Sequence, residues 1–155
     1  MKEIAKFFAE VIYDSPKYNT PNSCNDTDLL YPPFYEKIKK LETDYLEVHE
    51  TPFYILETYR SNTLQQIYFN RGASQIRSNG MHHYGIAVDL VAKINGKVRY
   101  DVLDYAWIRD YVSKDDNLWL KEGDMTMLNF EDAHIQYIRV SQQNELRHAV
   151  VDEMS

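Results

Sequence analysis

The fold is decided by the stretch Gly85-Ile86-Ala87-Val88-Asp89-Leu90-Val91, which is short, apolar and rich in the β-branched residues that favour strands. A few residues later the chain reads Asn95-Gly96, the dipeptide that most favours a tight hairpin turn, and then Lys97-Val98-Arg99-Tyr100. Two strands joined by such a turn run antiparallel. The segment therefore predicts a β-hairpin that belongs to an antiparallel sheet.

Apolar spacing on both sides of this hairpin predicts further strands and helices. Two more strands are expected, at 53–59 and at 134–140. Helices are expected at 2–12, from Pro32 to about Leu41, from a cap at Ser61 or Asn62 through Tyr68, from a cap at Asp101 to a turn at 114–117, and from about Gln142 to Val151. The polar stretch 15–28 is expected to be a loop. Helices flanking a small, mainly antiparallel sheet make an α+β fold.

Length and composition fit one folded domain. The chain has 155 residues, of which 44% are hydrophobic and 26% charged. This is the composition of a folded protein and not of a disordered one. A chain of this size has room for one core and little for a second. We therefore expect a single domain over residues 1–155, with the functional motifs in about 53–140.

Several classes of protein are disfavoured. No stretch approaches the roughly 18 to 20 apolar residues of a membrane-spanning helix. The first residues lack a continuous apolar region and a small-residue cleavage site, so we expect no signal peptide and a cytoplasmic location at synthesis. A net charge of −7 argues against binding nucleic acid through bulk positive charge. The single cysteine, Cys24, excludes an intramolecular disulfide and a C-x-x-C site.

Residues of the types that bind metal ions lie near the predicted strand at 85–91 and near the last predicted strand. His82 enters the first of these strands on a loop, Asp89 lies within it, and His134 begins the last predicted strand. Hydrolytic zinc sites typically take three His or carboxylate ligands and leave a fourth position to water. If the two strands are neighbours, these three side chains could meet, with Gly85 permitting a close approach. Glu131, three residues before His134, could then act as general base without binding the metal.

Other assignments remain open for neighbouring residues. His83 could replace His82 as a ligand, and Asp132 could replace Glu131 as the base if the turn is displaced by one residue. An isolated His beside a strand is more often a hydrogen-bonded structural residue than a ligand. His49 and His148 lie outside any motif and are expected at the surface.

The sequence resembles the zinc D-alanyl-D-alanine carboxypeptidases and L-alanyl-D-glutamate endopeptidases of peptidoglycan. This family includes phage endolysins and shares its fold with the Hedgehog signalling domain. Its pattern H-x-x-G-x-A-x-D is matched from His82 to Asp89, and its pattern [D/E]-x-x-H is matched by Glu131 and His134. An upstream Y-R-S element with a following Gln is matched by Tyr59-Arg60-Ser61 and Gln65. The three elements occur in the family's order.

The resemblance implies a Hedgehog/DD-peptidase-like fold and a role for each matched residue. His82, Asp89 and His134 would bind zinc, and Glu131 would be the catalytic base. Arg60 would steady the substrate carbonyl or its oxyanion, which suits a guanidinium because it is always charged. Gln65 would contact or support the substrate. Family members often carry Ser two residues before the first His; this chain has Gly80 there, and the nearest serine, Ser78, is the candidate for that contact.

The resemblance also implies a function, and two alternative functions are considered beside it. The expected activity is zinc-dependent hydrolysis of a peptide bond in the peptidoglycan stem peptide, carried out by a monomer and in the setting of a phage-type endolysin released to the cell wall. One alternative is a non-catalytic zinc-bearing binding domain of the same fold. Another is an iron oxygenase with two His and one carboxylate, although the usual H-x-D/E pair is absent. Which peptidoglycan bond is cut is left open.

Overall fold

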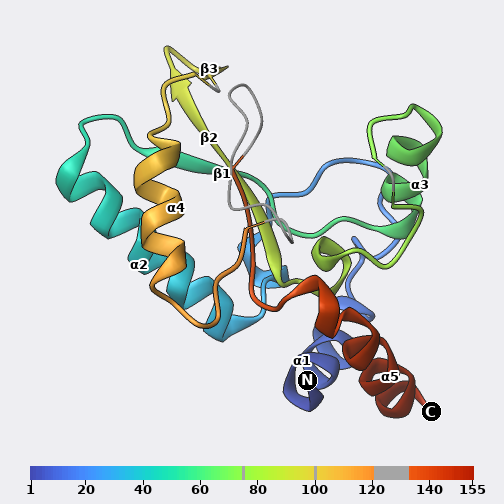
Figure 1. The fold of residues 1–155 in the computed structure, drawn as a ribbon. Coiled ribbons are helices and arrows are strands. Elements are labelled where there is room, and N and C mark those ends of the chain that lie inside the picture. Colours follow the sequence, from blue (N-terminus) through green and yellow to red (C-terminus); the bar gives the residue numbers. More distant parts are fainter. Residues whose placement is uncertain (75, 100, 121–132) are drawn as a thin grey trace.

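The computed structural model describes residues 1–74, 76–99, 101–120 and 133–155 (Figure 1). Five α-helices and four strands lie in these ranges, and their order is α1 (Lys2–Phe7), α2 (Pro32–Val48), β1 (Phe53–Glu57), α3 (Asn62–Asn70), β2 (Ala87–Ile94), β3 (Lys97–Arg99), α4 (Tyr105–Ser113), β4 (Ala133–Gln136) and α5 (Gln143–Met154). Shorter helical turns lie at Phe8–Ile12, Thr27–Leu29, Met81–Tyr84 and Val140–Gln142, the first of them π-helical.

All strand pairs in the described sheet are antiparallel, and β2 is its centre. β1 pairs with one side of β2, while β3 and β4 pair with successive parts of the other side. The predicted hairpin is confirmed, because Asn95 and Gly96 both have positive φ and join β2 to β3. The α+β class with a small antiparallel sheet is therefore confirmed.

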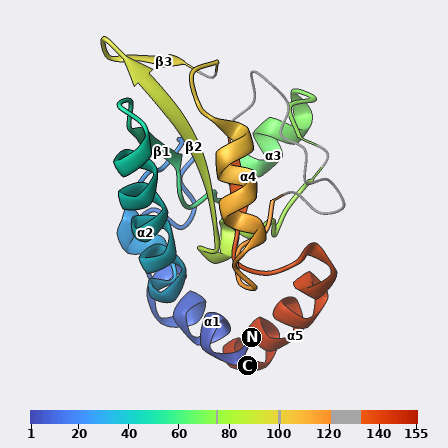
Figure 2. The ribbon, with the colours of Figure 1, turned by 60° about the vertical axis from the view of Figure 1, so that its left-hand side comes forward.

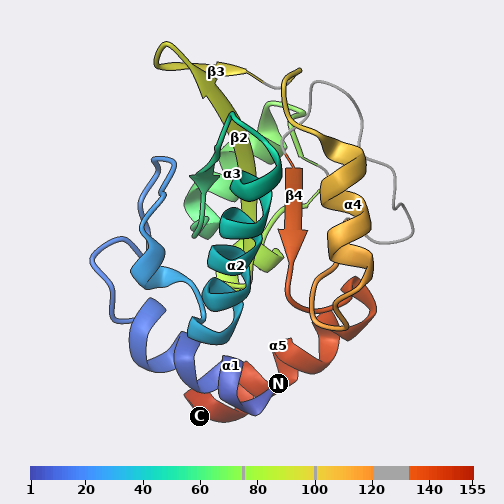
Figure 3. The same ribbon diagram turned by 90° about the vertical axis from the view of Figure 1, so that its left-hand side faces the viewer.

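Helices lie on both sides of this sheet. α2 and α4 run beside each other against one face, and α3 lies on the opposite side (Figures 1 and 3). α1 and α5 pack together at one end, where both chain termini are found (Figure 2). No helix in the described ranges is long and apolar enough to cross a membrane.

Side chains of the central strands alternate between an apolar and a polar face. Val88 and Leu90 of β2 belong to the hydrophobic core, as does Ile135 of β4. Successive side chains of a strand point to opposite faces, so Asp89 and His134 project away from these residues. The sheet thus separates the core from a polar surface on which a site can be built.

β1 departs from this alternation at one point. Phe53 and Ile55 pair with Ala92 and Leu90, but the register then shifts by one residue, so that Glu57 lies opposite Asp89. Such a bulge changes the face toward which the following side chains point. Glu57 consequently faces the polar side of the sheet with Asp89, although Phe53 and Ile55, at the same alternation, pack with the core.

Several predicted boundaries were wrong: β1 ends at Glu57 and not at residue 59, and β2 spans Ala87–Ile94 and not 85–91. α2 does not end near Leu41 but continues to Val48, because Tyr45 extends its buried stripe by a further turn. α4 is not capped by Asp101, which pairs with Arg99; its cap is Asp104, whose carboxylate accepts from the Trp107 N–H at 3.1 Å.

The last strand was also predicted too long. β4 ends at Gln136 instead of residue 140, since its partner β2 begins at Ala87, opposite Gln136. A 3-10 turn over Val140–Gln142 follows and leads into α5.

Candidate metal centre

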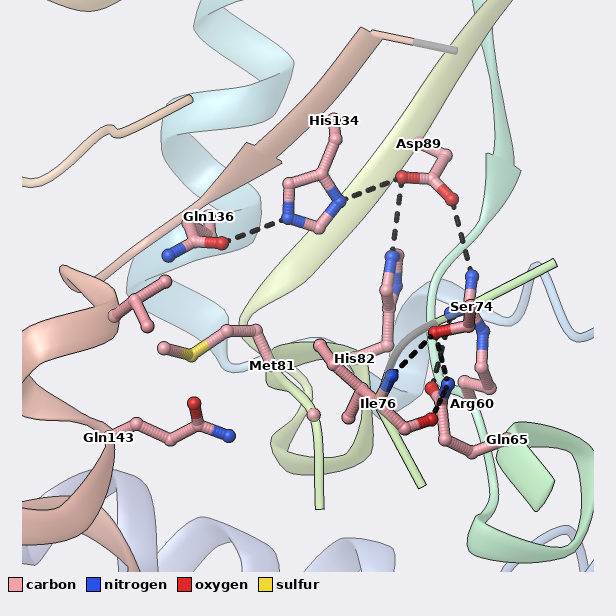
Figure 4. Close-up of a pocket in the computed structure, with 12 residues that line it drawn as sticks. Arg60, Gln65, Ser74, Ile76, Met81, His82, Asp89, His134, Gln136 and Gln143 are labelled. Atoms are coloured by element: carbon pink, nitrogen blue, oxygen red, sulfur yellow. Dashed lines mark hydrogen bonds and ion pairs between the residues drawn. The ribbon is translucent and has the colours of Figure 1, made fainter. Parts of the chain in front are cut away.

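Three side chains from three elements converge on the polar side of the sheet. His82 comes from the 3-10 turn before β2, Asp89 from β2 itself and His134 from β4 (Figure 4). Asp89 Oδ1 lies 3.3 Å from His82 Nε2 and 2.9 Å from His134 Nδ1. One donor atom from each of the three residues lies within 4.8 Å of the other two.

Strand register accounts for two members of this group. Asp89 and His134 are directly opposite each other in the β2–β4 ladder. Directly opposed residues of an antiparallel pair have Cβ atoms only about 4.5–5.5 Å apart, so their side chains meet without any special loop geometry. The expectation that the two strands are neighbours is confirmed.

Gly85 accounts for the position of the third residue, His82. It ends the turn that carries His82 with a φ of 71°, in the left-handed region that favours glycine. A Cβ atom at this position would collide with the Leu29 carbonyl oxygen and would lie 2.9 Å from Ile12 Cδ1. The turn can therefore fold back over β2 only with a glycine here.

The contact between His82 and Asp89 shifts the pKa values of both residues, in opposite directions. Burial acts to raise the pKa of Asp89, but the His82 and His134 imidazoles outweigh it and hold that pKa well below its usual value. Burial acts to lower the pKa of His82, and the Asp89 carboxylate overcomes this effect and raises it. The Asp89 carboxylate thus favours positive charge beside it.

These residues fit a zinc ion by donor type, spacing and tautomer. Two imidazoles and one carboxylate are a ligand set of hydrolytic zinc sites, and ligands bound at about 2.0–2.2 Å in a tetrahedron lie roughly 3.4 Å apart. The distances from Asp89 are near this value. His82 Nδ1 donates to the Thr58 carbonyl oxygen at 2.8 Å, which leaves the Nε2 lone pair of a neutral ring facing Asp89. The three residues could hold a metal ion.

Arg60 stands beside this group and is held on several sides. Its Nη2 lies 3.5 Å from Asp89 Oδ2, and both Nε and Nη2 pair with Glu57, whose side chain is only 4% exposed. The guanidinium lies over the Tyr68 ring at 4.8 Å, and Nη1 donates to Gln65 Oε1 at 3.2 Å. The cation is therefore fixed in place next to the candidate metal ligands.

A cavity of about 440 Å³ opens onto these residues. The three candidate ligands and Arg60 line it together with Gln65, Ser74, Ile76, Gly80, Met81, Gln136, Val140 and Gln143. The Gln65 amide is already engaged, because it accepts from Arg60 and donates to Ser74 Oγ and to the Ile76 carbonyl oxygen. Ser78 is exposed and is not among the lining residues; Ser74 is.

The remaining predicted residues fall into two groups. Glu131 and Asp132 lie outside the described residues, so which of them serves as the base stays a prediction. His83 is described and is buried among Phe8, Tyr18 and other aromatic rings, where burial lowers its pKa to about 4. It is not one of the residues that line the cavity.

One histidine outside the motifs was misplaced. His49 was expected at the surface, but it stacks on Tyr45 with ring centroids 3.9 Å apart and its Nε2 bonds Asp104 at 3.0 Å. It therefore joins the end of α2 to the start of α4. His148 is exposed, as expected.

Sequence reasoning missed two polar residues at the site. Glu57 stands where strand alternation points to the core, and only the bulge in β1 brings it to Arg60. Gln136 lies two residues after His134, and alternation along β4 would have placed it on the same face. The two-residue alternation of a strand was therefore a signal from which Gln136 could have been predicted. The sequence contained no comparable signal for Glu57.

Solved structures of peptidoglycan-type peptidases are among those that the chain resembles. The crystal structure of Serratia marcescens L-Ala D-Glu endopeptidase ChiX matches with a TM-score of 0.53 and 24% identity, covering 72% of this chain and 83% of that one. The chain shares the fold of this endopeptidase. The E175A mutant of the vancomycin resistance D,D-pentapeptidase VanY, in complex with Zn(II), matches with a TM-score of 0.49 and 14% identity, covering 81% and 84%. No protein-family model and no curated protein sequence matches the chain.

The match to ChiX confirms the fold that the motifs implied. It extends over 72% of this chain and 83% of that one, so it is not limited to one hairpin. The resemblance to peptidoglycan peptidases stated from the sequence is thereby supported at the level of architecture, and what the site does is argued separately below.

Proposed function

We propose that the chain is a zinc-dependent peptidase that hydrolyses a peptide bond in the peptidoglycan stem peptide. The observation that carries this proposal is the convergence of His82, Asp89 and His134 on a cavity that also contains the fixed cation of Arg60. A ligand set alone is compatible with many metalloproteins. A ligand set beside a half-buried, oriented guanidinium fits a reaction in which negative charge develops on an oxygen atom.

The three ligands would hold the ion through His82 Nε2, a carboxylate oxygen of Asp89 and His134 Nδ1. Zinc bound there would polarise the scissile carbonyl and lower the pKa of a water molecule toward about 7. The Thr58 carbonyl, by accepting from His82 Nδ1, holds that ring in the orientation that ligation needs.

Arg60 orients the substrate and stabilises its oxyanion. The guanidinium keeps its charge at every relevant pH, so it can face a developing oxyanion without exchanging a proton. Its pairing with Glu57 and its contact with the Tyr68 ring remove the need to order a long side chain when substrate arrives. Arg60 therefore serves as a preorganised donor.

Glu131 is proposed as the group that takes the proton from the attacking water and passes it to the leaving amine. This role rests on its spacing of three residues before His134 and on the resemblance to the peptidoglycan peptidases. The stem peptide is proposed as substrate on the same resemblance, together with the fold shared with an L-Ala D-Glu endopeptidase. An endolysin made in the cytoplasm and acting on the wall after release is the proposed setting.

Metal analysis followed by digestion tests the proposal. Protein loaded with zinc is incubated with purified peptidoglycan, and the products are separated by mass so that cuts at L-Ala–D-Glu and at D-Ala–D-Ala bonds are distinguished. We expect new peptide termini with the wild type and none after chelation or with Glu131→Gln. Arg60→Ala is expected to retain zinc and to lose most of the activity.

Three outcomes would overturn it. Zinc binding with retention on wall peptides but no cleavage would favour the non-catalytic binding domain. Oxygen consumption after anaerobic loading with iron, without cleavage by the zinc form, would favour an oxygenase. Failure of the wild type to bind zinc at all would remove the metal site and the mechanism with it.

A further inference from the structure

Gln136 is a buried polar residue that the proposed mechanism leaves unused. It lies on β4 two residues after His134, on the same face of the sheet, and only 2% of its surface is exposed. Its backbone is fixed as well, because its N–H and C=O both bond Trp119, each at 2.8 Å. The backbone of Gln136 is therefore held in the sheet, with the side chain on the face that carries His134.

The orientation of its side-chain amide follows from its hydrogen bonds. The NH₂ group donates to the Ile138 carbonyl oxygen at 2.8 Å. A carbonyl oxygen can only accept, so this end of the amide must be the nitrogen. The other end, Oε1, then faces His134 Nε2 at 2.9 Å (Figure 4). The usual ambiguity between the two ends of an amide is removed by the Ile138 carbonyl.

This orientation decides which nitrogen of His134 carries a proton. Oε1 accepts and cannot donate, so Nε2 must hold the hydrogen of the bond. In the neutral ring, Nδ1 is then the unprotonated nitrogen, and it is this atom that lies 2.9 Å from Asp89 Oδ1. Two acceptors this close repel each other unless a proton or a cation lies between them.

The two ring nitrogens of His82 have the opposite roles to those of His134, and the ring also faces Asp89. Its Nδ1 donates to the Thr58 carbonyl and its Nε2 faces Asp89. One imidazole is thus presented through Nε2 and the other through Nδ1, each with its second nitrogen bound to a carbonyl oxygen. Lone pairs of two imidazoles and a carboxylate then face one small space.

We propose that Gln136 is a positioning residue that sets the tautomer of His134 and so presents Nδ1 as the metal-binding atom. The inference rests on the proposed zinc site and adds to it the residue and the atom through which β4 binds the ion. Partners of this kind typically change metal affinity by 10–100-fold when removed.

The experiment compares zinc affinity in three variants by competition with a chromophoric chelator. Gln136→Leu, which keeps the volume and removes the acceptor, is expected to weaken zinc binding about 10- to 100-fold. Gln136→Glu, with its buried carboxyl group neutral, keeps an acceptor toward His134 and an O–H that can donate to the Ile138 carbonyl oxygen, and is expected to remain within a few-fold of wild type. Gln143→Leu removes a glutamine from the same cavity that bonds the Asn79 carbonyl and no histidine, and is expected to leave zinc affinity unchanged.

A second measurement needs no substitution and therefore does not depend on folding of a variant. The ¹⁵N chemical shifts of the His134 ring in zinc-loaded wild type are expected to show a protonated Nε2 and a metal-bound Nδ1. Zinc bound through Nε2, or equal zinc affinity in wild type and Gln136→Leu, would overturn the role of Gln136 and leave the proposed function standing. Absence of zinc binding in wild type would overturn both.

Discussion

Asp89 and His134 lie directly opposite each other on β2 and β4, and Oδ1 of the first is 2.9 Å from Nδ1 of the second. The pair is part of the strand ladder, so the backbone hydrogen bonds that build the sheet also set the spacing of two candidate ligands. Only His82 depends on a turn, and that turn is fixed by Gly85. The geometry of the site is therefore largely a property of the sheet.

Removal of His134 is expected to abolish stabilisation by zinc. A ligand that binds only the folded state stabilises it by about 2.7 kcal/mol at 100 times its dissociation constant. Wild type should bind about one zinc per chain and unfold at a higher temperature when zinc is added, whereas His134→Ala should do neither. Calorimetry and metal analysis by mass spectrometry measure both. The control is His148→Ala, an exposed histidine that should behave as wild type.

Glu57→Gln is expected to cost stability because it removes the carboxylate that pairs most closely with the Arg60 cation and leaves only the longer contact with Asp89. Breaking a buried ion pair by removing one member costs about 3–5 kcal/mol, and the side chains of Glu57 and Arg60 are only 4% and 16% exposed. Urea unfolding gives the value. Asp110→Asn breaks a pair whose members are 68% and 74% exposed and should cost less than about 0.5 kcal/mol. Equal costs for the two variants would contradict the prediction.

Gly85→Ala is expected to prevent stable folding or to destabilise the chain severely. The left-handed backbone alone costs a non-glycine residue about 1–2 kcal/mol, and the collision with the Leu29 carbonyl adds to this. Gly96→Ala is the matched control, because Gly96 has a similar φ of 76° but no atom within 4 Å of the added Cβ. The difference between the two free energies of unfolding isolates the collision, and its absence would show that the turn can move.

Stability should fall in mild acid because of His83. Burial lowers its pKa to about 4, below the usual value of 6.5, so between these pH values the unfolded state binds the proton and the folded state does not. The contribution is full above about pH 6.5 and is lost as pH falls toward 4, by up to about 3 kcal/mol.

The measurement is the difference in unfolding free energy between wild type and His83→Phe, taken at several pH values with chelator present. Phenylalanine can pack among the same aromatic rings and does not titrate. The difference should favour Phe increasingly as pH falls. A difference that does not change with pH would refute the shifted pKa as its cause.

The sequence predicted the elements that carry strong local signals. Asn95-Gly96 specified the hairpin, and Ser61 or Asn62 the start of α3. Residue types and their spacing specified the candidate ligands, whereas the pairing of the strands that carry Asp89 and His134 was assumed and not predicted. Each signal lies within a few residues of the feature it predicts. The candidate ligand set could be assembled from the sequence for that reason.

Features that depend on distant contacts could not be predicted in the same way. The end of α2 is set by burial of Tyr45 against other elements, and the cap of α4 is decided between two aspartates, Asp101 and Asp104, that look alike in sequence. The contact between Glu57 and Arg60 requires a register shift that no residue type in β1 announces. Tertiary packing overrides local preference at each of these positions.

Because of the register shift in β1, side chains of one short strand lie in two different environments, the apolar core and the polar site. Phe53 and Ile55 pack with the apolar core, and Glu57 joins a polar network on the other side of the sheet. No side chain is shared by the two environments at the strand, so substitutions in one should add to, and not couple with, substitutions in the other. Residues of the proposed site could therefore be altered on this framework while the core that supports them keeps its packing.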